Sequence, residues 1–265
     1  MIISAFAIQN SKIKFTEVII LRFSTNALVI KESNIGEQDK LITLLTADRG
    51  VIKAYAAGAK SIKSKRAAAT GLLSYASFTI DKKGENFRIT EATPISLFFG
   101  AGSDIVILSL SQYFCELSAI IEPPPEESQE FLRLILNSLH FLTQKKKNPV
   151  LIKAITELRI LSTSGYLPNL LACEDCGKFE DDIMYFNIEN GSLYCKECMQ
   201  GVNLLPINRT VLEAMRHIVY SNFDKLYSFS IPETDAELLS NLTERYLLFQ
   251  TELKITTLDF FNSIK

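Results

Sequence analysis

Four cysteines of this 265-residue chain form two Cys-x-x-Cys pairs with eighteen residues between them. This spacing lies inside the range of four-cysteine zinc modules. Two thiolates on one tight turn can face the same ion at about 2.3 Å, and a second turn completes a tetrahedral set. The spacing predicts one structural Zn²⁺ per chain, while redox-active dithiols and an iron–sulfur cluster remain alternatives. The predicted ligands are Cys173, Cys176, Cys195 and Cys198.

This set of four cysteine ligands argues against a catalytic zinc site. A hydrolytic zinc site keeps one position open for water and usually recruits histidine or a carboxylate, whereas four thiolates close the shell. The only two histidines, His140 and His217, lie in helical stretches far from the cysteines in sequence. The fifth cysteine, Cys115, lies on an apolar helix face, where a buried, unreactive thiol is expected. No phosphate-binding loop, nucleophile elbow or dinucleotide fingerprint is present, so we expect a binding protein with no small-molecule substrate and no enzyme activity.

A second group of residues suits phosphate binding. Residues 49–80 contain six basic residues and no acid, although the formal net charge of the chain is −2. The segment "GAKSIKSKR" concentrates these cations on a flexible stretch, where each can neutralise a phosphate. A solubilising loop is the alternative interpretation. Aromatic residues that could stack on bases occur nearby; they are Tyr55, Tyr75, Phe78 and Phe87.

The elements that position these residues change in type along the chain. Five short β-branched or aromatic segments predict strands at residues 26–32, 40–46, 50–58, 75–83 and 86–92. Five strands with a longer excursion after the third fit a small closed barrel such as an OB-fold. Apolar residues at helical spacing then predict helices at residues 104–121, 127–142, 148–166, 208–220 and 235–253, the last capped by Asp235. "ENGS" between the cysteine pairs predicts a hairpin turn.

The predicted fold is therefore α+β and multi-domain: an N-terminal OB-fold barrel, then a helical domain with an inserted four-cysteine zinc module. No uninterrupted apolar run approaches the ~20 residues that span a bilayer, and the N-terminus lacks the basic and cleavage-site features of a signal peptide. We expect a cytoplasmic protein without a membrane partner. The predicted units are an N-terminal extension at 1–25, the OB-fold at 26–95, helical parts at 103–170 and 203–265, and the zinc module at 171–202.

The order of these features resembles the bacterial recombination-mediator family RecO. The resemblance rests on "ALVIKESNIGEQDKLITLLTADRGVIKAYAAGAKSIKSKR", which is similar to the family's opening strand, its "YGE.D.L.TLLT" stretch and its glycine-rich basic loop. It continues in "LRILSTSGYLPNLLACEDCG", which is similar to the family's leucine-rich helix and "G..P.L..C..CG". It covers residues 26–200, while the C-terminal helices match only in character.

The resemblance implies DNA repair in the RecF pathway. It implies binding and annealing of single- and double-stranded DNA, contact with the C-terminal tail of the single-stranded-DNA-binding protein SSB, joining of RecR and help in loading RecA, at the nucleoid. DNA contacts carried onto this chain are Lys40, Arg49, Lys53, Lys60, Lys63, Lys65 and Arg66. For partner proteins we expect an apolar groove with basic rims within residues 105–165, using Lys153 and Arg159.

Two other functions remain open. A protein–protein adaptor with a structural zinc module would bind partners without DNA affinity. A zinc-dependent or dithiol enzyme would need titratable thiols in the folded protein.

Overall fold

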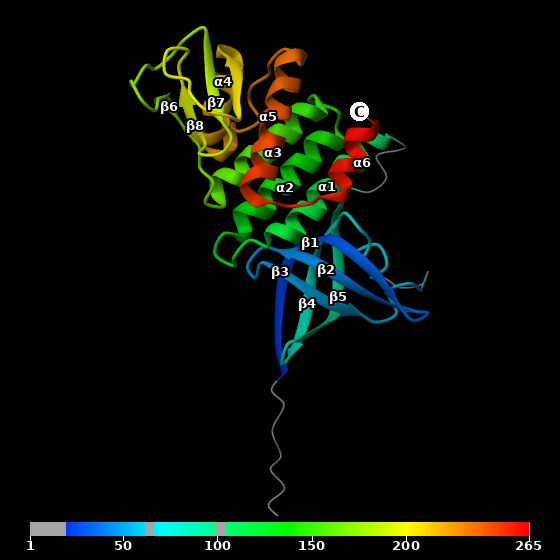
Figure 1. Cartoon of the computed structure of the whole chain (residues 1–265). Helices are drawn as coiled ribbons and strands as arrows, with labels where there is room; N and C mark the ends of the chain where they lie inside the picture. Colours follow the sequence, from blue (N-terminus) through cyan, green and yellow to red (C-terminus); the bar gives the residue numbers. More distant parts are fainter. Residues whose placement is uncertain (1–19, 62–65, 99–103, 265) are drawn as a thin grey trace, which may run out of the picture.

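The structure is a computed structural model that describes residues 20–61, 66–98 and 104–264. Figure 1 shows three units in a row: a strand-rich unit at the N-terminal end, a helical body, and a second sheet at the far end of the helices. Lys63 and Lys65 lie outside the described residues, as does most of the predicted 1–25 extension. No helix in the described part is long and apolar enough to cross a membrane.

The N-terminal unit is a closed barrel with strand order β1-β2-β3-β5-β4, which confirms the predicted barrel. All neighbouring pairs are antiparallel except β3 and β5, which run parallel. Buried residues alternate with more exposed ones along β3 and β4, as expected for strands with one face on a core. The strands are β1 (Ile20–Ile35), β2 (Asp39–Thr46), β3 (Val51–Ala56), β4 (Ser74–Lys83) and β5 (Asn86–Leu97).

The first and last strands of the barrel are longer than the sequence predicts. β1 begins at Ile20, before the predicted boundary at residue 26, and β5 continues to Leu97. A tight hairpin turn joins β4 to β5, where Gly84 has a positive φ of 59°. The long excursion between β3 and β4 carries the basic loop.

The barrel docks on the helical body through the turn between β2 and β3. Ser128, the first residue of α2, donates its hydroxyl to the carbonyl of Thr46 at 2.5 Å. Gly50 has φ +64°, and a Cβ at this position would lie 2.7 Å from the carbonyl oxygen of Pro123. Only glycine permits this close approach of two backbones.

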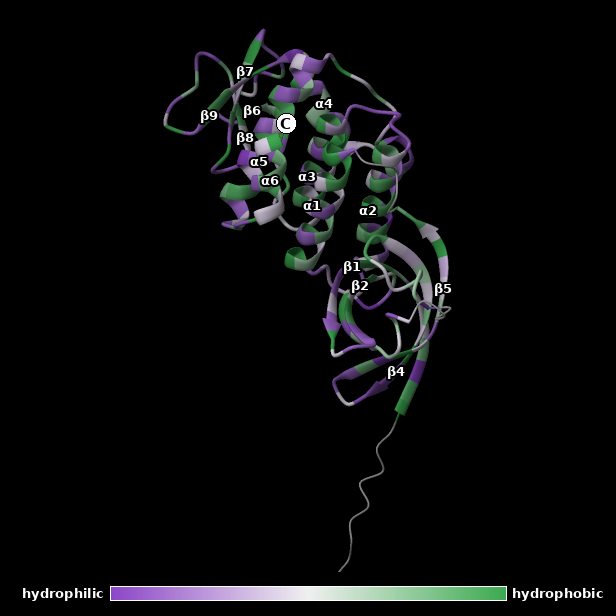
Figure 2. Ribbon diagram, turned by 90° about the vertical axis from the view of Figure 1, so that its right-hand side faces the viewer, coloured by the Kyte–Doolittle hydropathy of each residue, from purple (hydrophilic) through white to green (hydrophobic). Residues whose placement is uncertain are grey.

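The helical body has α3 at its centre, packed against α1, α2, α4 and α5. Apolar residues recur along these helices (Figure 2) and form one continuous core. Asp104 and Asn148 cap α1 and α3 with their side chains, as sequence patterns at those ends favour. The helices are α1 (Ile105–Ile121), α2 (Ser128–Thr143), α3 (Pro149–Thr163), α4 (Arg209–Tyr220), α5 (Glu233–Thr251) and α6 (Thr256–Ile264), with a short 3₁₀ turn, η1, at Phe223–Lys225.

Two details of the C-terminal helices differ from the sequence-based expectation. The prediction that Asp235 caps α5 is wrong, because the N-cap is Pro232 and Asp235 lies in the first turn, where it accepts a hydrogen bond from Asn208. Helix α6 has no counterpart among the predicted helices. Its first turn is held by Glu116 of α1, whose carboxylate accepts bonds from the backbone and hydroxyl of Thr257.

The cysteine-bearing unit is a four-stranded sheet of order β6-β8-β7-β9. The predicted hairpin is present as the antiparallel pair β7 and β8, on either side of the "ENGS" turn. The sheet extends beyond the predicted 171–202 module because β6 starts at Asn169 and β9 ends at Asn208. Its strands are β6 (Asn169–Cys173), β7 (Ile183–Asn187), β8 (Ser192–Tyr194) and β9 (Leu204–Asn208).

Candidate nucleic-acid interface and metal centre

An open depression of about 530 Å³ lies on the outer face of the barrel, where β2, β3 and β5 meet. The parallel pairing of β3 with β5 places Tyr55 beside Arg88. Lys53 and Arg88 are exposed, and Tyr55 and Phe87 are half-buried, so cations and aromatic rings share one surface. The lining residues are Leu41, Lys53, Tyr55, Glu85, Asn86, Phe87 and Arg88, which we call the barrel groove.

Asp39 fixes the tyrosine of the barrel groove. Tyr55 donates its hydroxyl to one carboxylate oxygen of Asp39, and the backbone N–H of Gly58 donates to the other at 2.7 Å. The Gly58 bond is the largest cause that holds the pKa of Asp39 below its ordinary value, and the Tyr55 bond is the next. Because the carboxylate is ionised and accepts two hydrogen bonds, it ties the start of β2 to the end of β3 and holds the ring in place.

The predicted DNA-contacting cations lie along β3 and the two loops that flank it. Lys53 lines the barrel groove. Arg49, in the turn before β3, stacks its guanidinium on the Phe23 ring with 3.9 Å to the centroid. Lys60, in the loop after β3, donates its ammonium to the Gly36 carbonyl at 2.7 Å. The structure therefore distributes these three cations over the length of one strand.

Two further predicted cations have local partners. Lys40 forms an ion pair of 2.8 Å with Glu32 on the neighbouring strand. Arg66 donates to the carbonyl of Ile89 at 3.3 Å, on the strand that carries Arg88. Among the predicted cations in the described ranges, Lys53 is therefore the one that lines the barrel groove.

Sequence reasoning missed Arg88 and over-counted the aromatic residues. Arg88 lies outside the basic segment, and only the parallel pairing of β3 with β5 brings it next to Tyr55. The predicted barrel carried an indirect signal, because closing five strands requires pairs that are not neighbours in sequence. Phe78 is fully buried in the barrel core and Tyr75 packs partly against the helical core, so neither lines the barrel groove.

The four paired cysteines converge at one end of the second sheet. Their sulfur atoms all lie within 4.8 Å of one another, and the Sγ atoms of Cys176 and Cys195 are 3.7 Å apart. Four sulfurs at 2.3 Å from a tetrahedral ion are separated by about 3.8 Å. The four thiols therefore fit a metal ion with a closed shell of sulfur ligands.

Backbone turns present these sulfurs in the way that metal-binding knuckles require. Gly177, with φ +74°, donates its N–H to the Cys173 carbonyl at 3.0 Å. The N–H of Cys195 points at the sulfur of Cys173 at 3.3 Å. Burial alone would raise the pKa of the Cys173 thiol, but backbone N–H groups of Cys176, Cys195 and Asp175 bring it down to about 6. Such donors favour the thiolate, which is the form that binds metal.

The remaining cysteine lies in a different environment. Cys115 is buried in α1, within the helical core, and burial raises the pKa of its thiol to about 12. A neutral thiol in an apolar site is inert, as the sequence pattern predicts.

Arg216 of α4 attaches the second sheet to the helical body. Its guanidinium donates to the carbonyls of Leu170, Leu171 and Phe179 at 2.8–2.9 Å. It also stacks on the Phe179 ring, with 4.1 Å to the centroid. One arginine therefore fixes both β6 and the segment between the cysteine pairs.

The predicted basic rim at Lys153 is wrong. Lys153 is fully buried and pairs with Glu157 at 2.9 Å and with Glu244 at 2.8 Å. Tyr113 and Thr243 donate their hydroxyls to Glu157, so the polar cluster is satisfied internally. Sequence periodicity could not show that Lys153 is buried. Periodicity assumes that a helix packs on one face, whereas α3 packs against α1, α2, α4 and α5.

Arg159 does line a depression between α2 and α3, but it does not supply a free basic rim. Its guanidinium donates to the carbonyls of Ile218, Val219 and Ser221 at the end of α4. The rim of that depression carries Glu127 and Glu130 instead.

Comparison with known proteins identifies the family. Residues 20–98 match the family model of the recombination protein O N terminal, and residues 102–259 match that of the recombination protein O C terminal. The chain belongs to the RecO family. The two matches meet where the barrel ends and the helical body begins.

Curated relatives carry the same assignment over nearly the full length. The DNA repair protein RecO of Acetivibrio thermocellus is 32% identical over 243 residues, which is 91% of this chain and 96% of the relative. That of Caldicellulosiruptor bescii is 29% identical over 241 residues, covering 91% and 98%. That of Caldicellulosiruptor saccharolyticus is 28% identical over 238 residues, covering 90% and 97%. The chain is therefore a RecO-family DNA repair protein, and the predicted family resemblance is confirmed.

Proposed function

We propose that this RecO-family chain is a strand-annealing mediator of the RecF repair pathway and binds DNA through the barrel groove. The observation that carries the proposal is the convergence of Lys53 and Arg88 with Tyr55 and Phe87 on one exposed face. Grooves that bind single strands combine cations along the backbone with aromatic rings under the bases. The barrel groove has both.

The groove and its flanking loops divide the work of binding. Lys53 and Arg88 neutralise phosphates inside the groove, and the cations that follow β3 in the sequence add further phosphate contacts. Phosphates are common to both forms of DNA, so these cations serve single and double strands, whereas Tyr55 meets only unpaired bases. By neutralising two strands at once, the surface lowers the repulsion that opposes annealing. This work needs no covalent chemistry.

The metal proposed for the four-cysteine site is a structural Zn²⁺. Four sulfur ligands, a closed shell and the knuckle turns support zinc over a catalytic metal. Zinc contributes folding free energy to a sheet that is too small to fold alone. Metal analysis of the purified chain should return one zinc per chain.

The helical body is proposed to meet the protein partners implied by the family. These are RecR and the C-terminal tail of SSB, which together allow RecA to load at the nucleoid of the cytoplasm. The body supports this role because it presents partly exposed aromatic side chains between the barrel and the second sheet. Phe141 and Phe223 are two of these, and they line an open depression together with His140 and Tyr227.

Salt dependence tests the DNA-binding part of the proposal. Affinity for single strands should fall steeply as salt rises, and replacement of Lys60, Lys63 and Lys65 by glutamine should flatten the slope. A salt-insensitive affinity, or an unchanged slope in the triple variant, would contradict it.

Annealing with partners separates the mediator from an adaptor without intrinsic DNA binding. Complementary strands coated with SSB should anneal faster with the chain than without it, and addition of RecR should change the rate. An adaptor would bind SSB or RecR but would anneal nothing and show no DNA affinity.

A further inference from the structure

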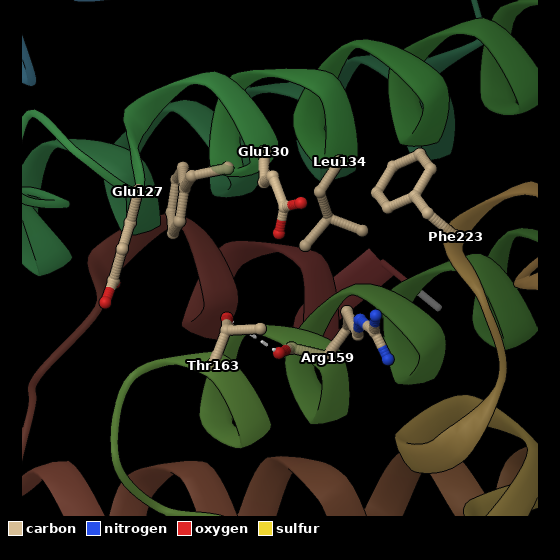
Figure 3. A pocket seen from close by; sticks show the side chains of 7 residues that line it. Glu127, Glu130, Leu134, Arg159, Thr163 and Phe223 are labelled. Carbon is tan, nitrogen blue, oxygen red and sulfur yellow. Dashed lines mark hydrogen bonds between the residues drawn. The ribbon is translucent and has the colours of Figure 1, made fainter. Parts of the chain in front are cut away.

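A small depression between α2 and α3 has a charge opposite to that of the barrel groove. It has a volume of about 200 Å³, a size that suits one long side chain. Phe131 and Leu134 of α2 form its floor, together with Phe223 of η1. Figure 3 shows Glu127 and Glu130 on the upper helix and Arg159 on the helix below. We call this depression the α2–α3 pocket.

The positive charge of Arg159 is already engaged. One nitrogen of its guanidinium lies 3.1 Å from the carbonyl oxygen of Ile218, 2.9 Å from that of Val219 and 3.4 Å from that of Ser221. These groups form the C-terminal end of α4, where unpaired carbonyls and the helix dipole concentrate negative charge. These three bonds hold the guanidinium of Arg159 at the end of α4, and it forms no ion pair with Glu127 or Glu130.

The two glutamates of the α2–α3 pocket lie at the start of α2, where the helix dipole favours negative charge, but they have no side-chain partner among the described residues. Glu127 and Glu130 are exposed, and neither carboxylate has a hydrogen bond or ion pair with any residue in the described part of the chain. The carboxylate of Glu130 points from α2 into the space between the two helices (Figure 3). The pocket thus presents an apolar floor below two unpaired negative charges.

An arginine of the chain itself already binds beside the α2–α3 pocket through an aromatic ring and a carboxylate. The guanidinium of Arg133 lies 4.1 Å from the centroid of the Phe223 ring and forms an ion pair of 2.5 Å with Asp224. This arrangement combines an aromatic ring with a carboxylate. The α2–α3 pocket offers the same two groups, while the arginine that lines it, Arg159, is bonded to the end of α4.

We propose that the α2–α3 pocket binds an arginine or lysine side chain of a partner protein, with apolar residues on either side of it. The stem of the side chain packs on Phe131, Leu134 and Phe223, and its charged end lies between Glu127 and Glu130. This surface is separate from the barrel groove, so the inference goes beyond DNA binding and identifies a docking site for a basic protein segment.

Short synthetic peptides of equal length test the proposal with the zinc-loaded full chain. One carries an arginine flanked by leucines, a second carries glutamine in its place and a third carries aspartate. Affinity is measured by fluorescence anisotropy, and the binding site is located by the amide shifts of α2. The arginine peptide should bind at least about tenfold more tightly than the other two and should shift the resonances of residues 127–134.

Charge removal on the pocket provides the decisive variant. The double change E127Q and E130Q should weaken the arginine peptide about tenfold and leave single-strand DNA affinity unchanged. E126Q is the matched control, because Glu126 is an exposed neighbour that does not line the pocket, and it should change neither. Melting temperatures of all variants report on folding.

Three results would overturn the proposal. They are tighter binding of the aspartate peptide, an arginine peptide that binds E127Q/E130Q as tightly as the unchanged chain, and no arginine-peptide binding at millimolar concentration. Because DNA affinity is measured on the same samples, failure of this docking site is distinguishable from failure of the barrel groove.

Discussion

The barrel and the second sheet differ in net charge and in whether their polar side chains face solvent or one another. Residues 20–98 contain twelve basic and seven acidic residues, whereas residues 169–208 contain two basic and seven acidic residues. The barrel leaves Lys53 and Arg88 exposed around an open groove, while the second sheet turns its four sulfurs toward one another within 4.8 Å. The exposed cations of the barrel suit a large anionic partner. The four sulfurs of the second sheet face inward and leave no ligand position for a partner molecule.

Chemically reactive residue types therefore do not by themselves mark the site of function. The cysteines are the most reactive side chains of the chain, but four of them are arranged as a closed set that fits a metal ion, and a bound ion would leave them unreactive. Lysine and arginine are common residues, but Lys53 and Arg88 are exposed beside aromatic rings, an arrangement that suits the DNA binding we propose.

The largest expected effect is loss of the metal site. Replacement of Cys195, a fully buried ligand, by alanine should reduce bound zinc from one per chain to almost none and lower the free energy of unfolding by several kcal/mol. At about 3 °C per kcal/mol, the melting temperature should fall by roughly 10 °C or more. Mass spectrometry of metal content and calorimetry measure the two effects. Cys115→Ala is the control and should keep its zinc, and a Cys195→Ala chain with full zinc would remove the contrast between the two regions.

Next in size is the effect of removing groove charge. The double change Lys53→Gln and Arg88→Gln should reduce the slope of log affinity against log salt by about 1.4 for single strands, at 0.7 per phosphate contact. Neutralising two exposed acids on the second sheet, Asp182→Asn and Glu197→Gln, is the matched control and should leave the slope unchanged. Effects of similar size and opposite sign from the two pairs would show that overall charge, and not the groove, governs binding.

Base stacking on Tyr55 should contribute a smaller effect that distinguishes DNA forms. Tyr55→Ala should weaken single-strand binding by about 1–3 kcal/mol and double-strand binding much less, because paired bases are not available to the ring. Tyr55→Phe keeps the ring but loses the bond to Asp39, so its loss should be intermediate. Anisotropy titrations with both DNA forms measure this, and equal losses on both would refute stacking.

The smallest expected effect is a pH dependence of the barrel. The pKa of Asp39 is lowered from its ordinary value of 3.8, first by the Gly58 N–H and then by Tyr55. A lowered pKa in the folded state contributes stability above pH 3.8 that is lost as pH falls through the folded value. Urea midpoints measured from about pH 5 downward should therefore fall less steeply for Asp39→Asn than for the unchanged chain. Glu37→Gln, just before β2, is the control. If the urea midpoints of Asp39→Asn and of the unchanged chain fall equally steeply with pH, the hydrogen bonds of Asp39 do not stabilise the barrel.

Local chemistry in the sequence accounts for the features that were predicted correctly. Cysteine spacing predicts the four-thiol cluster because two tight turns are local structures, and their "ENGS" hairpin brings them together. Short β-branched or aromatic runs predict the five barrel strands, and helical periodicity predicts α1–α5, since each pattern is confined to one stretch of the chain. The family motifs follow the same local order along the chain.

Long-range packing, which only the tertiary structure shows, settles which polar residues face solvent and which meet across the fold. Arg88 joins Lys53 and Tyr55 only through the parallel pairing of β3 with β5, which no local pattern encodes. A lysine in a helix is expected to face solvent, but Lys153 lies in the core because other helices surround α3. Its positive charge is paired there with Glu157 and Glu244. Exposure and long-range pairing depend on what packs against an element, so the physical reason lies in the neighbours and not in the residue itself.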